Sequence, residues 1–131
     1  MRKILSILLI LCAFLAGGCS VEDDDLWCTV TFNAVLPDGS TFETMIVDMA
    51  PQGNFFRNIN NLYEYDIASF VGGKSSQRIL KGMYLISFDA VCVMDDGSRV
   101  KVRCADHNSP NTAIDLTSDA ETVTLKLLKL K

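Results

Sequence analysis

Apolar and polar residues alternate along the chain after residue 27, and this two-residue period predicts half-buried β-strands. The first such run is followed by the turn signal Pro37-Asp38-Gly39, which predicts a hairpin with a three-residue loop. The inward residues of the run are Cys28, Val30, Phe32, Ala34 and Leu36. In this predicted hairpin Leu36 pairs with Ser40, Ala34 with Phe42, Phe32 with Thr44 and Val30 with Ile46.

A second hairpin is predicted around Asp95-Asp96-Gly97, where the same turn chemistry recurs. A three-residue loop places the apolar residues of both strands on one face, whereas a two-residue loop would separate them. The predicted pairs are Met94 with Ser98, Cys92 with Val100, Ala90 with Val102 and Phe88 with Cys104. On the opposite face this register places Asp89 beside Arg103.

The remaining sequence predicts further short strands joined by turns. Residues 49–61 are rich in Asn, Pro and Gly, which indicates a loop, and alternation over 63–67 indicates a strand. A long strand is expected from Met83, and two short strands are expected within 114–127. No stretch shows helical periodicity. We therefore expect an all-β domain over 28–131, a single antiparallel β-sandwich of immunoglobulin-like type with about seven strands.

The first residues have the pattern of a lipoprotein signal peptide spanning 1–18. Arg2 and Lys3 precede an apolar run from Ile4 to Leu15, then small residues and Cys19. The apolar run is too short for a transmembrane helix, which needs about 20 residues. Cys19 is the predicted lipidation site and would begin the mature protein. The alternative is an ordinary secretory signal with a coincidental cysteine.

Residues 19–27 are predicted to form a tether between the lipid and the domain. Its acidic residues are Glu22, Asp23, Asp24 and Asp25. This run resembles the export signal that directs Bacteroidota lipoproteins to the outer face of the outer membrane. The alternative is a merely solvated tether. We expect a protein anchored to the outer membrane through Cys19 and facing the cell exterior, held off anionic head groups by its own carboxylates.

The charge of the mature chain argues against nucleic acid as a partner. Removal of residues 1–18 leaves 10 of the 12 basic side chains against 16 acidic ones, a formal charge of −6. The field of such a protein opposes the approach of a polyanion. About a hundred residues remain after the tether, which is enough for one hydrophobic core.

Three cysteines remain in the domain, namely Cys28, Cys92 and Cys104. In the predicted hairpin Cys92 and Cys104 lie too far apart for a disulfide. Cys28 is therefore the candidate partner of either one, and the alternative is three small buried thiols. No cysteine pair has the close spacing of a zinc site, so we expect no metal.

Catalytic signals are weak. The single histidine, His107, is predicted to lie in a loop, Asp106-His107-Asn108-Ser109, but residues adjacent in sequence do not form a catalytic triad. No phosphate-binding loop or dinucleotide fingerprint occurs. We expect a protein that is not an enzyme and has no cofactor.

Two features suggest binding. Phe55, Phe56, Tyr63 and Tyr65 could form an exposed aromatic platform for a sugar or a protein, and the alternative is that they belong to the core. In the final strand Val123, Leu125 and Leu127 share one face, but Leu128 and Leu130 break the phase. Such a strand could cap its own sheet or pair with a neighbour.

The start of the mature chain, Cys19 to Leu26 followed by Cys28 and a strand, resembles the fimbrium-anchoring lipoproteins of Bacteroidota, the FimB type. The run Leu80-Lys81-Gly82-Met83-Tyr84 before a long strand is also similar to their transthyretin-like sandwich domains. Those proteins generally have two such domains, whereas this chain has room for one. The resemblance implies a structural role in anchoring or terminating a surface fibre.

The leading hypothesis is a lipid-anchored surface β-sandwich with a structural or protein-binding role, such as fimbrium anchoring or adhesion. The alternative is a carbohydrate-binding accessory lipoprotein of a glycan-uptake system.

Overall fold

The computed structural model describes residues 25–130. The predicted signal peptide, the predicted lipidation site Cys19 and the acidic residues Glu22, Asp23 and Asp24 lie outside the described residues. Asp25 lies within them and is exposed.

The described chain is 59% β-strand, and its one named helical element is a short 3₁₀ turn, η1 (Pro110–Thr112). The strands are β1 (Trp27–Val35), β2 (Phe42–Ile46), β3 (Phe55–Asn58), β4 (Phe70–Val71), β5 (Lys74–Leu80), β6 (Gly82–Met94), β7 (Arg99–His107), β8 (Ile114–Leu116) and β9 (Ala120–Lys129). The all-β class predicted from the sequence is confirmed.

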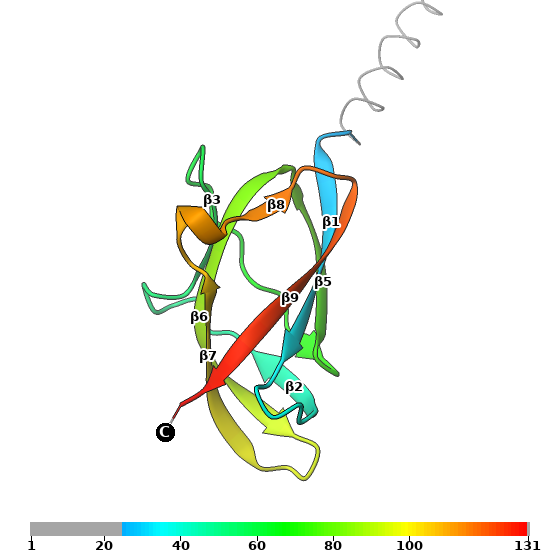
Figure 1. The fold of residues 1–131 in the computed structure, drawn as a ribbon, viewed down its shortest axis with the longest axis vertical. Helices are drawn as coiled ribbons and strands as arrows, with labels where there is room; N and C mark the ends of the chain where they lie inside the picture. The colour runs from blue at the N-terminus through cyan, green and yellow to red at the C-terminus, as the bar shows by residue number, and fades with distance from the viewer. Residues whose placement is uncertain (1–24, 131) are drawn as a thin grey trace, which may run out of the picture.

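Seven of these strands form a closed barrel rather than the two sheets of a sandwich (Figure 1). Their order is β2-β4-β5-β1-β9-β7-β6, and β6 pairs again with β2. Strands β3 and β8 pair with the first half of β6, outside this ring. The expectation of a wholly antiparallel sandwich also differs in one pairing, because β9 runs parallel to β1.

The core follows the alternation seen in the sequence. In β1 the even-numbered residues point inward, and Cys28, Val30 and Phe32 are fully buried. Phe56, Tyr84 and Phe88 complete the centre, with Phe32 and Phe56 packed edge to face at a centroid distance of 5.3 Å. This burial of apolar area is the main force that holds the barrel together.

The hairpin predicted around Pro37-Asp38-Gly39 does not form. The turn itself is present, but β1 pairs with β5 and β9, and β2 pairs with β4 and β6. A bulge between Phe42 and Thr44 leaves Phe42 and Met45 of β2, and Val47 just after it, facing inward. Ile46, predicted to face the core, is 68% exposed because the bulge reverses the alternation.

The second predicted hairpin is confirmed at every pair. Met94 donates to Ser98 across the turn, and the register places Cys92 opposite Val100, Ala90 opposite Val102 and Phe88 opposite Cys104. On the outer face the Arg103 guanidinium contacts the Asp89 carboxylate at 2.7 Å, and this hydrogen bond holds the pKa of Asp89 below its usual value.

Between the hairpin regions the predictions are partly wrong. Phe55 and Phe56 lie in strand β3 rather than in a loop, and residues 63–67 form only one isolated bridge, from Glu64 to Arg57. The long strand from residue 83 is confirmed as β6, and the two final strands are β8 and β9. β9 lies between β1 and β7, and it pairs with β1 through residues 120–126 and with β7 through residues 127–129, so each of its edges is paired over part of its length.

The barrel has two distinct ends (Figure 1). At the entry end β1 begins beside the β5–β6 connection, where the Lys81 amide donates to Leu26, and residues 59–63 extend from the end of β3. At the turn end the Asp38-Gly39 and Asp96-Gly97 turns lie together, and β9 ends. The Thr41 hydroxyl donates to the Asp95 carboxylate and joins the two turns.

Candidate binding surfaces

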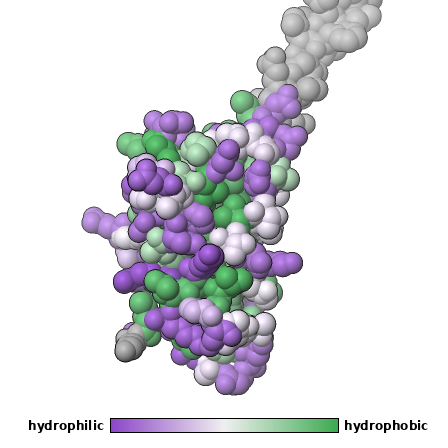
Figure 2. All heavy atoms as spheres, viewed as in Figure 1, coloured by the Kyte–Doolittle hydropathy of each residue, from purple (hydrophilic) through white to green (hydrophobic). Residues whose placement is uncertain are grey.

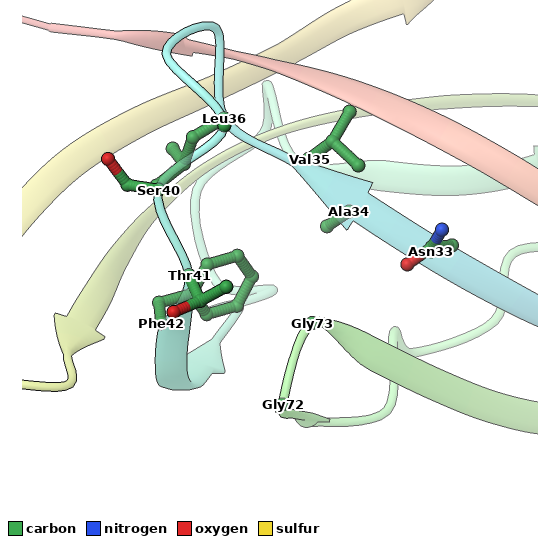
Figure 3. A pocket seen from close by; sticks show the side chains of 10 residues that line it. Asn33, Ala34, Val35, Leu36, Ser40, Thr41, Phe42, Gly72 and Gly73 are labelled. Carbon is green, nitrogen blue, oxygen red and sulfur yellow. The ribbon is translucent and has the colours of Figure 1, made fainter.

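A small pocket opens at the turn end, where β1 separates from the β4–β5 turn (Figure 3). The Ala34 amide donates to the Gly73 carbonyl at 2.8 Å, and beyond this bond the two segments diverge. Gly73 has a φ of 81°, and a Cβ there would lie 3.3 Å from the Ala34 oxygen, so glycine permits the close approach. Figure 3 shows the pocket between residues 33–36, residues 40–42 and Gly72–Gly73.

The size and lining of this pocket indicate what it can accept. Its volume is about 190 Å³, below the ~300–1,000 Å³ of typical small-molecule sites. Leu36 and Phe42 supply apolar surface, Asn33, Ser40 and Thr41 supply neutral polar groups, and no charged side chain lines it. These properties suit one uncharged side chain of a partner protein.

A second hollow lies on the outer surface between the end of β1 and β9. Val35, Leu36 and Pro37 form one side, and Lys126 and Leu128 form the other. Val35 is 38% exposed and Leu128 is 55% exposed. Figure 2 shows hydrophobic residues gathered in the lower half of the same view, where Figure 1 draws the end of β9.

The two hollows are neighbours, because Val35 and Leu36 line both of them. We call residues 33–42 with Leu128 the turn-end surface. Lys129 borders it and contacts the Asp38 carboxylate at 2.6 Å, and this bond with the Ser40 contacts holds the pKa of Asp38 well below its usual range. Sequence analysis missed this surface, because it depends on contacts between residues 33–42 and residues distant in the sequence.

The predicted aromatic platform is only partly exposed. Phe56 is fully buried and its ring lies 4.9 Å from Tyr84, so its candidate role in ligand binding is wrong. Phe55 is half-buried, with the Arg57 guanidinium 4.4 Å above its ring. The same guanidinium contacts Glu64 at 3.0 Å, which keeps it over Phe55.

The two tyrosines of the predicted platform have different environments. The Tyr65 hydroxyl accepts a hydrogen bond from the Leu80 amide at 3.1 Å, so this residue links two segments of the barrel wall. Tyr63 is 57% exposed and packs edge to face on Tyr65 at 4.8 Å. The exposed neighbour of Tyr63 is Leu62, which sequence analysis did not select and whose only signal is an apolar residue in an Asn-rich turn.

The cysteines of the domain are buried, free thiols, so the candidate disulfide from Cys28 to Cys92 or Cys104 is absent. Burial raises the pKa of Cys92 to about 11. Burial together with the Asp106 carboxylate, 3.5 Å from the sulfur, raises the pKa of Cys104 further. Thiols held protonated in this way are weak nucleophiles and weak metal ligands.

His107 lies at the end of β7 rather than in a loop. Its Nδ1 is 2.9 Å from the Thr112 carbonyl oxygen and its Nε2 is 3.4 Å from that of Thr124. The Asp106 carboxylate is 3.6 Å from Nε2. The ring therefore links β7 to the η1 turn and β9, and among residues 25–130 no serine or cysteine side chain bonds to it.

Within residues 25–130 no group of three or more His, Cys, Asp or Glu side chains is arranged to hold a metal ion. None of the helical segments in that part of the chain is long and apolar enough to cross a membrane. Comparison with known proteins finds no matching family model, no matching curated protein and no matching solved structure.

Proposed function

We propose that this chain is a lipid-anchored protein of the outer membrane surface that holds a protein partner at the turn-end surface. The observation that carries this proposal is the position of that surface. It lies at the opposite end of the barrel from the start of β1, the strand that follows Cys19 in the sequence (Figure 1). An anchor at one end and exposed apolar residues at the other suit a structural component such as a fimbrium anchor.

The physical case for a protein partner rests on shape and composition. Val35 and Leu128 are exposed apolar side chains beside a pocket that fits one side chain, which is the arrangement of an interface with a central anchor residue. The joined turns and the Asp38–Lys129 contact fix this surface in place before binding. A preformed surface loses little conformational entropy when a partner binds.

The anchor is tested by metabolic labelling with a fatty-acid probe. We expect the full chain to incorporate the label and to remain with the outer membrane, and the Cys19→Ala variant to lose both properties. An unlabelled wild-type protein that washes into the soluble fraction contradicts the anchor.

The partner surface is tested by crosslinking and pull-down from outer membranes. We expect a stable complex with wild-type protein that Leu128→Asp abolishes, because a carboxylate there is desolvated in the interface. The matched control is Ile46→Asp, since Ile46 is 68% exposed and lines neither of the two hollows. Equal loss of the complex in both variants contradicts the assignment.

The second candidate is carbohydrate binding, and the exposed Tyr63 ring supports it. A sugar can stack on such a ring. Glycan-array binding that Tyr63→Ala abolishes would favour this function over the first. Neither function needs catalysis, and we propose that the protein is not an enzyme; turnover of an ester or glycoside that depends on His107 would contradict this.

A further inference from the structure

The residues 59–63 form a rigid tip at the entry end of the barrel. The side chain of Asn58 is 4% exposed, and its Oδ1 accepts hydrogen bonds from the Asn60 and Asn61 amides at 2.9 and 3.2 Å. The main chain of Asn58 bonds to Leu62 and Tyr63 at 3.0 and 2.9 Å. Gly82 leaves room for the Asn58 side chain. A Cβ at residue 82 would lie 2.5 Å from the side-chain Nδ2 of Asn58.

The tip exposes two apolar side chains. Leu62 is 67% exposed and Tyr63 is 57% exposed. Leu62 also has a φ of 62°, a conformation that asparagine or glycine adopts at lower cost. Folding alone would favour a small polar residue at this position. A strained, exposed leucine on a rigid support indicates a contact with something outside the barrel.

The position of the tip identifies what that contact is. The Ile59 amide donates to Met83 and the Lys81 amide donates to Leu26, so the tip and the start of β1 flank the same strand connection. Seven residue steps separate Cys19 from Leu26, a reach of at most about 25 Å. A lipid on Cys19 therefore keeps the entry end, with its exposed Leu26, next to the bilayer.

The charges at the entry end indicate the kind of lipid surface. Arg57 is paired with Glu64, and Lys81 is paired with Asp119 at 2.6 Å. The third basic side chain here is Arg78, which is exposed and lies 5.1 Å above the Trp27 ring. Each basic side chain at this end of residues 25–130 therefore has a partner, and Asp25 adds a further exposed negative charge. This arrangement favours apolar insertion into a zwitterionic phospholipid surface, where a tyrosine ring is well placed, over attraction to anionic head groups.

From these observations we infer that Leu62 and Tyr63 insert into the surface of a zwitterionic phospholipid bilayer and fix the orientation of the anchored barrel, with the turn end outward. The inference rests on the proposed lipidation of Cys19. Two contacts, the lipid and the tip, restrict tilting that a single tether would allow.

The test places one tryptophan at the tip of the full, lipidated chain. The chain has a single tryptophan, Trp27, so Trp27→Phe removes the background signal. Tyr63→Trp in that background reports on the tip, and Ile46→Trp is the matched control, because Ile46 is 68% exposed and lies in β2 away from the entry end. Each protein is reconstituted on phosphatidylcholine vesicles with and without bromine on the acyl chains, and each is separated by flotation.

We expect bromolipid to quench the tryptophan at residue 63 severalfold more strongly than the one at residue 46. Adding Leu62→Asn should remove most of that quenching without changing flotation, because asparagine keeps the turn but lacks the apolar side chain. A protein that floats but shows equal quenching at both positions overturns this inference alone. A protein that does not float overturns the lipid anchor and this inference with it. A tryptophan at residue 63 that responds to glycans and not to bromolipid overturns it in favour of sugar binding.

Discussion

The two Asp-Gly-Ser turns have the same local structure and opposite roles in the fold. In both, the aspartate Oδ1 accepts from the serine amide and hydroxyl, at 3.0 and 2.6 Å in the first turn and at 2.9 and 2.6 Å in the second. Gly39 and Gly97 both have positive φ, at 76° and 86°. Yet the second turn joins paired strands, and the first sends the chain across to different partners.

The difference lies in what the flanking strands can pair with. After the second turn, Met94 donates to Ser98 and seven pairs follow between β6 and β7. At the first turn Ala34 donates instead to Gly73, and both edges of β1 are taken by β5 and β9. The same turn can therefore join two strands that pair with each other, as in a hairpin, or two strands that pair with other partners, which we call a corner. Long-range pairing decides between the two.

The largest difference in stability should appear when the apolar residue two positions after each turn serine is replaced. These residues are Phe42 after Ser40 and Val100 after Ser98. Phe42 is 3% exposed and packs in the core, whereas Val100 is only partly buried. We expect Phe42→Ala to reduce the free energy of unfolding by about 3–5 kcal/mol and Val100→Ala by about 1 kcal/mol. Urea denaturation measures both. Equal losses would mean that the corner depends no more on the core than the hairpin does.

A second difference should appear at Gly73, which supports only the corner. Alanine there combines a φ of 81° with a Cβ 3.3 Å from the Ala34 oxygen. We expect Gly73→Ala to cost more than the ~1–2 kcal/mol of the positive φ alone and to lower hydrogen-exchange protection of the Ala34 amide. Unchanged protection would contradict the role of this contact.

The turns themselves should respond alike. A Cβ at Gly39 or Gly97 would meet no atom within 4 Å, so only the positive φ opposes alanine. We expect Gly39→Ala and Gly97→Ala each to cost about 1–2 kcal/mol. Gly53→Ala is the control, because Gly53 lacks a positive φ and also has open space. A large difference between the first two variants would show that the turns are not equivalent.

The smallest effect should be on the response to acid. The Lys129 ammonium and then Ser40 lower the pKa of Asp38, whereas Ser98 alone chiefly lowers that of Asp96. A lowered folded pKa gives stability that is present above the unfolded pKa of about 3.9 and is lost as the pH falls below it. We expect Asp38→Asn to reduce the acid sensitivity of the urea midpoint more than Asp96→Asn does. A larger effect of Asp96→Asn would mean that the serine contacts, and not the Lys129 contact, contribute most of the acid sensitivity.

Sequence reasoning succeeded where structure is local. The second hairpin and the inward face of β1 followed from alternation and turn chemistry, and both are confirmed. It failed where a bulge reversed the alternation at Ile46 and where β1 took partners far along the chain. The turn-end surface was missed for the same reason, since Gly73 and Leu128 meet the 33–42 segment only after the ring closes.

For the aromatic residues the sequence indicated the region but not the orientation. Four candidates lie close together, and only the packing of Phe56 on Phe32 and Tyr84 shows that it belongs to the interior. Nothing in the local pattern separates Phe56 from Tyr63, because both are aromatic residues next to Asn-rich turns.

The pairing of β9 beside β1 also has a consequence for biosynthesis. These strands are about ninety residues apart, yet each supplies an edge that the other needs. Loop closure over such a distance is slow and entropically costly. A nascent chain therefore keeps an open seam between β1 and β7 until β9 has been made.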